Sequence, residues 1–380
     1  MLRVAIVGCG KIADSHASQI VRVPGCEIVG VCDRELLMAR QLHERFPVKA
    51  YFGDLATLLR EARPDVVHIT TPPASHFDIA RVCLERGCHV YIEKPVTLNA
   101  NDAEGLVALA NERGLKLTAG HDDQFSPVAR RMRTLVETGY LGGAPVHMES
   151  YFCYDLGHPE NARALLGERD NWVRKLPGKL LQNIISHGIA RIAEFLSGDA
   201  PRVIAYGFVS PFLRSLGESE ILDELRVIVS DDERTTAYFT FSSQMRPLLH
   251  QFRVFGPRNG LVVDQDQETL IKLRGQRFKS YAEKFVPSLG FAAQHLANVR
   301  ANGRSFLNKD FHMKSGLKHL IEAFYRSIGE GAAVPIPYRQ IVLTARIMDA
   351  IFDQVSARAM PAPAGGRLLD GRPQASRSGS

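Results

Sequence analysis

Short apolar runs alternate with longer amphipathic segments along the first third of the chain. The runs are rich in β-branched residues and too short for helices, which is typical of buried parallel strands. The predicted strands lie at residues 4–7, 27–33, 49–52, 65–71, 89–92 and 116–119. This alternation predicts an α/β domain at residues 1–121, built on a doubly wound parallel sheet.

The pattern changes after residue 121. A helix is expected at 129–137, and polar and apolar positions then alternate with few helices between the runs. Strands are predicted at 146–152, 202–209, 224–229, 235–241, 251–255 and 260–263, and helices at 289–299, 311–328 and 339–354. We therefore expect an α+β domain at 122–357 with a largely antiparallel open sheet, whose last helices can pack back on the first domain. Residues 358–380, rich in Pro, Ala, Gly, Arg and Ser, are predicted to be a disordered tail.

Composition narrows the possible partners. The chain has 380 residues with 45% hydrophobic content, enough for two domains, and its net charge of +6 is not gathered into blocks. Nucleic-acid binding is therefore not favoured. Six cysteines without a C-x-x-C pair favour reduced thiols, and no signal peptide or long apolar stretch is evident. We expect a cytoplasmic protein without a membrane partner.

A glycine-rich turn, Gly8-Cys9-Gly10-Lys11-Ile12-Ala13, follows the first strand. Gly8 lets the backbone reverse, Gly10 lets it approach a pyrophosphate, and the next helix offers its N–H groups to phosphate. Asp33 ends the second strand, where a carboxylate can bind the adenosine ribose and would repel a 2′-phosphate. The pattern predicts NAD as the cofactor. NADP stays an alternative because the adjacent Arg34 could pair with that phosphate, unless it is simply solvated.

The segment Glu93-Lys94-Pro95 closes the fifth strand. Pro95 ends the strand because it has no N–H, so Lys94 projects at the carboxyl end of the sheet, where doubly wound folds bind ligands. An ammonium group there can stabilise a developing alkoxide and help to move a proton. Glu93 is expected to orient the loop or contact the cofactor. The alternative is an ordinary Glu-Lys pair in a surface turn.

In order and spacing, these motifs resemble the Gfo/Idh/MocA oxidoreductases, the group of glucose-fructose oxidoreductase and inositol dehydrogenase. The matching segments are the glycine turn with His16, and residues 71–76, 93–95, 119–120 and 125–127, whereas residues 121–124 depart from the family's pattern. The resemblance covers the chain to about residue 356. It implies a nicotinamide cofactor, a sugar-like or cyclitol substrate, and homo-oligomers, dimers or tetramers, that often form through the open sheet. It also implies cofactor contacts from Lys11, Ile12, Thr71, Pro72, His76, Glu93 and Lys94.

Residues 177–187 resemble the family's G-G-G-x-x-x-D-x-G-x-H helix. His187 falls on the family's histidine, which implies a general base, and Asn183 falls on the family's aspartate one helical turn earlier. An asparagine can orient a hydroxyl or the imidazole, but it cannot supply the negative charge that would raise the pKa of the histidine. Ile185 also replaces a family glycine. With Lys94, these two residues form the predicted catalytic set, although a core histidine is the simpler alternative for His187.

Asp122, Tyr154, Trp172 and Arg174 are predicted to contact substrate together with Asn183. The adjacent acids Asp122 and Asp123 favour a polyol substrate, or else they cap the next helix. Trp172 can stack on a sugar or anchor the core. Arg174 can pair with the phosphate of a sugar phosphate or nucleotide sugar.

The sequence thus predicts an NAD-dependent dehydrogenase of carbohydrate metabolism that acts on a secondary hydroxyl or ketone of a sugar, cyclitol, sugar phosphate or nucleotide sugar. A weaker resemblance is to members linked to surface-polysaccharide synthesis. The alternatives are an NAD-binding regulator or scaffold without turnover, and a closed-cycle epimerase or glycosidase that retains its cofactor. No metal site is expected because the histidines show no ligand spacing. Hydrolase chemistry is not indicated because no G-x-S-x-G elbow occurs.

Overall fold

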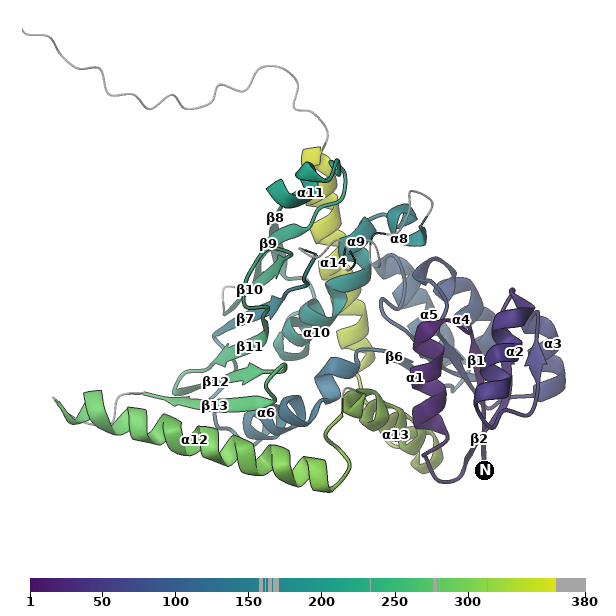
Figure 1. Ribbon diagram of the computed structural model, residues 1–380, viewed down its shortest axis with the longest axis horizontal. Coiled ribbons are helices and arrows are strands. Elements are labelled where there is room, and N and C mark those ends of the chain that lie inside the picture. Colours follow the sequence, from purple (N-terminus) through teal and green to yellow (C-terminus); the bar gives the residue numbers. More distant parts are fainter. Residues whose placement is uncertain are drawn as a thin grey trace, which may run out of the picture.

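The computed structural model describes residues 1–156, 160, 162, 166, 171–232, 234–275, 279, 281–312 and 314–359. Of the tail predicted at 358–380, residues 358 and 359 end the last helix, and residues 360–380 lie outside this description. Two sheets lie at opposite sides of the molecule with helices between and around them (Figure 1).

The first sheet has six parallel strands in the order β3-β2-β1-β4-β5-β6. The strands are β1 (Leu2–Val7), β2 (Cys26–Cys32), β3 (Tyr51–Phe52), β4 (Val66–Ile69), β5 (His89–Ile92) and β6 (Leu117–Ala119). Its helices are α1 (Lys11–Ile20), α2 (Leu36–Arg45), α3 (Leu55–Ala62), α4 (His76–Glu85) and α5 (Ala100–Glu112), with the 3-10 turn η1 (Pro73–Ser75) before α4. The order reverses between β1 and β4, the place where such sheets bind ligands. The predicted doubly wound parallel sheet is confirmed.

The second sheet has seven strands in the order β13-β12-β11-β7-β10-β9-β8. They are β7 (His147–Phe152), β8 (Arg202–Phe208), β9 (Glu224–Asp231), β10 (Thr235–Ser242), β11 (His250–Phe255), β12 (Asn259–Asp264) and β13 (Thr269–Arg274). All neighbours pair antiparallel except β7 and β10, which are parallel. The sequence pattern missed β13 because this edge strand buries only Leu270, so its polar and apolar positions do not alternate cleanly.

Helices α10 (Ser186–Phe195) and α14 (Tyr338–Ala359) cover one face of the second sheet. The other helices after residue 121 are η2 (Asp122–Phe125, a 3-10 turn), α6 (Pro127–Glu137), α8 (Trp172–Lys175), α9 (Lys179–Ile184), α11 (Pro211–Ser215), α12 (Ala282–Leu307) and α13 (Ser315–Glu330). The helix α10 packs against β7 and α14 against β8, and α14 also contacts α5 of the first domain. Among the described residues, none of the helices combines the length and apolarity needed to cross a membrane.

The helix α13 belongs to the core of the first sheet although it follows the second sheet in sequence. Its buried residues Leu317, Leu320 and Phe324 share a cluster with residues of β1, β4 and β5. A separate cluster joins the second sheet to α10 and α14. The position of the domain boundary, at residue 121, remains a prediction.

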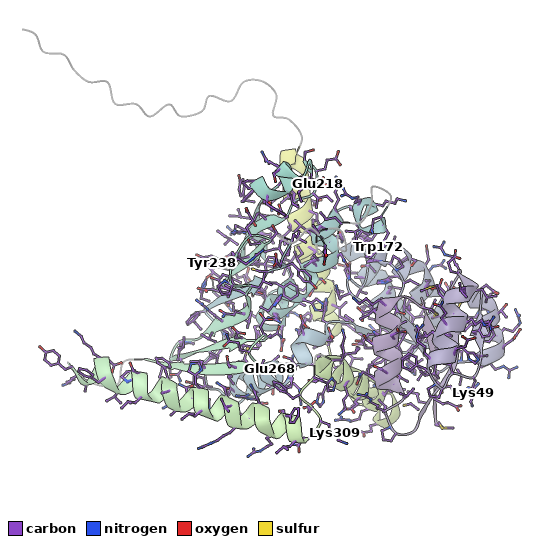
Figure 2. The ribbon with its side chains drawn as sticks, viewed as in Figure 1. Lys49, Trp172, Glu218, Tyr238, Glu268 and Lys309 are labelled. Carbon is purple, nitrogen blue, oxygen red and sulfur yellow. The ribbon has the colours of Figure 1, made fainter. Side chains whose placement is uncertain are left out.

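The other face of the second sheet is open. Ile204 on β8, Ile228 on β9 and Tyr238 on β10 lie directly opposite one another across the strands. All three are exposed, and Tyr238 lies on the side away from the first domain (Figure 2). An exposed apolar row of this kind is typical of an interaction surface.

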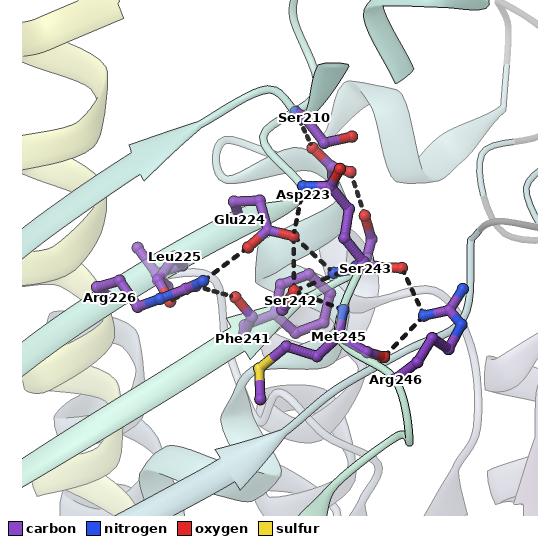
Figure 3. A network of polar contacts seen from close by, with 11 residues as sticks. Ser210, Asp223, Glu224, Leu225, Arg226, Phe241, Ser242, Ser243, Met245 and Arg246 are labelled. Carbon is purple, nitrogen blue, oxygen red and sulfur yellow. Dashed lines mark hydrogen bonds and ion pairs between the residues drawn. The ribbon is translucent and has the colours of Figure 1, made fainter. Parts of the chain in front are cut away.

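Two buried carboxylates hold the end of this sheet together (Figure 3). Asp223 accepts a hydrogen bond from the backbone N–H of Ser210 at 2.6 Å and another from the Ser243 hydroxyl. Glu224 accepts from the Ser242 hydroxyl at 2.7 Å and from the Arg226 guanidinium at 2.9 Å. These bonds tie β9, β10 and the segment before α11 into one network.

Replacing Glu224 by alanine is expected to lower the free energy of unfolding by about 3 kcal/mol, because buried donors lose their acceptor. Urea denaturation measures the change. The matched control is Glu44→Ala, which removes an exposed ion pair with Arg40 and should cost less than about 1 kcal/mol. Equal losses in the two variants would contradict a structural role for the network.

Candidate functional site

The glycine turn after β1 leaves room for a ligand. Gly8 has a φ of +93°, and a Cβ atom there would lie 2.7 Å from the backbone nitrogen of Thr71, so only glycine fits. A Cβ on Gly10 would meet no atom within 4 Å, so this side of the turn is open. No side chain caps the start of α1, which leaves its first N–H groups available to an anion.

A cavity of about 870 Å³ extends from this turn toward the end of β5. It is lined by the predicted cofactor residues Gly8, Gly10, Lys11, Ile12, Asp33, Arg34, Thr71, Pro72, Glu93 and Lys94. His76 is the exception. It is buried, and its two ring nitrogens each lie 2.8 Å from a backbone carbonyl oxygen, those of Pro95 and Thr71. His76 therefore joins the two loops that border the cavity instead of lining it.

The backbone orients Asp33 at the rim of this cavity. Its Oδ2 accepts a hydrogen bond from the N–H of Cys9 at 2.7 Å, and its Oδ1 accepts one from the N–H of Glu35 at 2.9 Å. The open turn, the uncapped helix and the fixed carboxylate are the parts that pyrophosphate and ribose require. The residues present therefore fit a dinucleotide.

Lys94 lies where this cavity meets a second one. The second cavity has a volume of about 510 Å³ and lies between the two sheets. Four residues line both cavities: Ile12, Glu93, Lys94 and Asn183. The ammonium of Lys94 donates a hydrogen bond to the backbone carbonyl of Asn183 at 2.9 Å, which joins the end of β5 to α9.

A buried chain of polar groups supports Glu93. The Nε2 of His16 lies 2.9 Å from Glu93 Oε1, the Nδ1 atoms of His16 and His68 are 2.8 Å apart, and His68 Nε2 lies 2.7 Å from the Tyr325 hydroxyl on α13. Burial alone would raise the pKa of Glu93, but its hydrogen bond with His16 and the charge of Lys94 lower it to about 2. Glu93 is therefore a fixed anion beside Lys94.

His187 opens onto the second cavity at the start of α10. Its Nδ1 lies 3.4 Å from Oδ2 of Asp123 on η2. Burial lowers the pKa of His187 to about 4, although the Asp123 charge opposes this shift. The imidazole is thus neutral near pH 7 and able to accept a proton.

Asp123 was predicted, together with Asp122, either to favour a polyol substrate or to cap the next helix, but not to contact His187. The same Oδ2 atom lies 3.7 Å from the guanidinium of Arg191, a buried residue. Burial raises the pKa of Asp123, but His187 and Arg191 outweigh it and lower the pKa. The adjacent Asp122 behaves in the opposite way, since burial and the charges of Asp123 and Glu93 raise its pKa to about 8. The pair therefore provides one carboxylate and one carboxylic acid near neutral pH.

The predicted substrate residues are distributed over several places. Asp122, Asn183 and Tyr154 line the second cavity, whereas Trp172 lines the cofactor cavity. Arg174 lines neither cavity: its guanidinium bonds to Glu218 at 2.7 Å and to the carbonyl of Leu166 at 3.1 Å. Asn183 and His187 were expected on one helix. The structure interrupts this helix at Ile185, so Asn183 lies on α9 and His187 on α10.

Several lining residues of the second cavity had no assigned role in the sequence. They are Ser126, Phe152, His250, Gln265, Asp266, Glu268, His312, Lys314 and Ser315. The acidic residues at 264–268, from the end of β12 to the start of β13, were a signal in the sequence. That some of them line the same cavity as His187 could not be inferred without the strand order.

Asp122, Asp123 and His187 also offer ligand atoms within 4.8 Å of one another, a spacing that a metal ion could use. Sequence spacing did not indicate this group because η2 and α10 are far apart in the chain. The guanidinium of Arg191 beside Asp123 opposes the binding of a cation there.

Residues 2–121 match the model of an oxidoreductase family with an NAD-binding Rossmann fold, Gfo/Idh/MocA. The D-glucoside 3-dehydrogenase of Escherichia coli is 34% identical over 37% of this chain and 40% of that protein. The scyllo-inositol 2-dehydrogenase (NAD(+)) of Bacillus subtilis is 22% identical over 80% of this chain and 87% of that protein. The matched segments span 40% to 48% of the first three curated relatives.

Solved structures extend the likeness to the whole fold. The UDP-N-acetylglucosamine 3-dehydrogenase of Acidithiobacillus ferrooxidans superposes with a TM-score of 0.71 at 21% identity, over 94% of this chain and 99% of that one. The WlbA dehydrogenase of Bordetella pertussis, solved with NADH and UDP-GlcNAcA, gives 0.74 at 15% identity, over 94% and 96%. At these identities the likeness concerns the fold. The domain at residues 2–121 belongs to the Gfo/Idh/MocA oxidoreductase family of NAD-binding Rossmann folds.

Proposed function

We propose that the protein is an NAD-dependent oxidoreductase that transfers a hydride between nicotinamide and a secondary hydroxyl or ketone of a sugar-like polyol. One observation carries this proposal. The cofactor cavity and the second cavity meet at Lys94, and the neutral imidazole of His187 opens onto the second one. Hydride transfer requires a dinucleotide-binding site, an adjoining substrate cavity and a group that accepts a proton.

The pyrophosphate would bind at the turn Gly8 to Gly10, and Asp33 would bind the adenosine ribose. Glu93 and Lys94 would border the nicotinamide, because they line both cavities. When bound, NAD supplies the hydride acceptor. The carboxylate that Asp33 presents favours NAD, with NADP as the alternative.

Proton transfer is assigned to Lys94 and His187. The Lys94 ammonium would donate a hydrogen bond to the substrate oxygen and stabilise the charge that develops there. His187 would take the hydroxyl proton, and the anion Asp123 would stabilise the resulting imidazolium. Asp123 would thereby supply the charge that Asn183 cannot, which favours turnover over a purely regulatory role.

The hydrogen-bonding groups around the second cavity favour an uncharged polyol or cyclitol. Five carboxyl groups line it: Glu93, Asp122, Asp123, Asp266 and Glu268. The carboxylates among them can accept hydrogen bonds from substrate hydroxyls, and Asp122, whose pKa is raised to about 8, can donate one. Since Arg174 pairs with Glu218, the support for a sugar phosphate or nucleotide sugar, and for surface-polysaccharide synthesis, is reduced.

The proposal includes homo-oligomers through the open face of the second sheet and a cytoplasmic location. The exposed row of Ile204, Ile228 and Tyr238 supports the first part.

The test offers the purified protein NAD and a panel of neutral sugars, cyclitols, sugar phosphates and nucleotide sugars, and follows NADH absorbance. We expect NADH with a neutral polyol and none with the same substrate when His187 is replaced by alanine. Bound NAD without net NADH, but with an epimerised or hydrolysed product, would indicate a closed cycle. NAD binding without any product would indicate a regulator, and both outcomes would contradict the proposal.

A further inference from the structure

The long helix α12 contacts its own chain through polar side chains. It runs along the edge strand β13 (Figure 1). Gln294 and Asn298 each bond with their side-chain amides to both backbone groups of one β13 residue, Lys272 and Leu270, at 2.7 to 3.2 Å. These amides pair the edge of the sheet as another strand would. The hydrogen bonds that hold α12 against β13 therefore come from polar side chains.

The outer face of α12 is apolar, the reverse of an ordinary surface helix. Along it, residues recur with the alternating spacing of three and four that defines a heptad seam. The seam consists of Ala282, Phe285, Leu289, Ala292, Leu296, Val299, Gly303 and Phe306, and every one of them is exposed. Phe285, Leu289, Leu296, Val299 and Phe306 are between 62% and 72% exposed. Within the described residues, nothing covers them.

This seam is complementary to itself. In an antiparallel pair of helices, the core residue at the first heptad position (a) of one helix faces the core residue at the fourth heptad position (d) of the other. With Gln294 at the centre of the pair, each contact joins a larger and a smaller residue. The facing positions are Ala282 with Phe306, Phe285 with Gly303, Leu289 with Val299, and Ala292 with Leu296. The alternation of sizes fills space evenly, as a helix-helix interface requires.

We propose that α12 of one copy pairs antiparallel with α12 of a second copy of this chain through the seam. A helix of 26 residues is about 39 Å long at about 1.5 Å per residue, enough for three heptads. Covering five large apolar side chains on each copy brings the buried area toward the roughly 1,200–2,000 Å² of stable interfaces. The contact is separate from the open face of the second sheet and does not depend on the proposed activity.

Molar mass in solution tests the pairing. In light scattering after size exclusion, the variant Leu289→Glu/Leu296→Glu should have half the mass of the wild type. The control Ala297→Glu places a single glutamate on the exposed position next to Leu296, outside the seam, and should keep the wild-type mass. Circular dichroism confirms that both variants are folded. A monomeric wild type, or an unchanged mass in the double variant, would overturn the proposal.

Disulfide capture tests the direction of the pairing. Co-expressed Leu289→Cys and Val299→Cys chains should form a covalent dimer on mild oxidation, because these positions face each other across the antiparallel pair. Each variant alone should not, and the wild type controls for the natural cysteines. Cross-linking of each variant alone would show parallel pairing and contradict the register. Binding of a monomeric wild type to anionic lipid vesicles, lost in Leu289→Glu/Leu296→Glu, would assign the seam to a membrane surface instead.

Discussion

Replacing Lys94 by alanine is expected to lower kcat by about 10³-fold while the affinity for NAD changes little. The ammonium lies at the junction of the two cavities, where the substrate oxygen gains negative charge. Loss of a positioned donor at such an oxygen typically costs about 10²–10³-fold, and loss of its part in proton transfer adds to this. Steady-state kinetics with the substrate identified by the panel, together with NAD titration by fluorescence, measure both quantities.

Lys11→Ala provides the contrasting control. Lys11 lines the cofactor cavity at the start of α1 and not the second cavity, so its loss should weaken NAD binding and leave kcat nearly unchanged. Because Lys94 also bonds to the carbonyl of Asn183, thermal unfolding of the Lys94 variant must be compared with that of the wild type. A folded Lys94→Ala enzyme with wild-type turnover would exclude this residue from the chemistry.

Replacing His187 by alanine is expected to lower kcat/KM for oxidation by about 10²–10³-fold at neutral pH, the usual effect of removing a general base. The base must be neutral to accept a proton. Since the pKa of His187 is lowered to about 4, wild-type kcat/KM should be flat from neutral pH down to about pH 5 and fall as the imidazole becomes protonated below that. A pH profile of kcat/KM measures this limb.

The substitution Asp123→Asn removes the negative charge of residue 123 and keeps the size of its side chain. The Asp123 anion raises the pKa of His187, so its removal should move the acid limb to still lower pH. It should also lower kcat by about 10-fold or more, because the imidazolium loses its stabilising charge. A purely structural role would change the stability of the protein but not the position of the limb. If the acid side of the kcat/KM profile stays at the same pH and kcat is unchanged, Asp123 does not act through His187.

The sequence predicted the first domain well because its signals are local. The segment 89–92 was predicted as a strand and is β5, and the turn chemistry of Gly8 and Gly10 follows from backbone geometry alone. The strand β13 was missed because an edge strand covered by amides needs little apolar alternation. A local sequence pattern reflects contacts between residues that are close along the chain. It does not predict a strand or a side-chain pairing that depends on residues brought together only by the tertiary fold.

The candidate site shows the same limit. Lys94, Asn183 and His187 were selected from motifs, and the structure brings all three to one cavity. Asp123 could not be paired with His187 from sequence, since η2 and α10 meet only through tertiary packing. Arg174 was predicted to pair with a phosphate because its charge is visible in the sequence, while its pairing with Glu218 is not.

The position of α13 has a consequence for synthesis on the ribosome. The six strands of the Rossmann sheet emerge from the ribosome before the second sheet, yet Leu317, Leu320 and Phe324 of their core, and the Tyr325 hydroxyl that meets His68, emerge only after it. During that interval the nascent sheet lacks one of its covering helices and exposes apolar surface. The NAD-binding domain can therefore complete its folding only after the second domain has been made, and a chain truncated before α13 would be a substrate for chaperones.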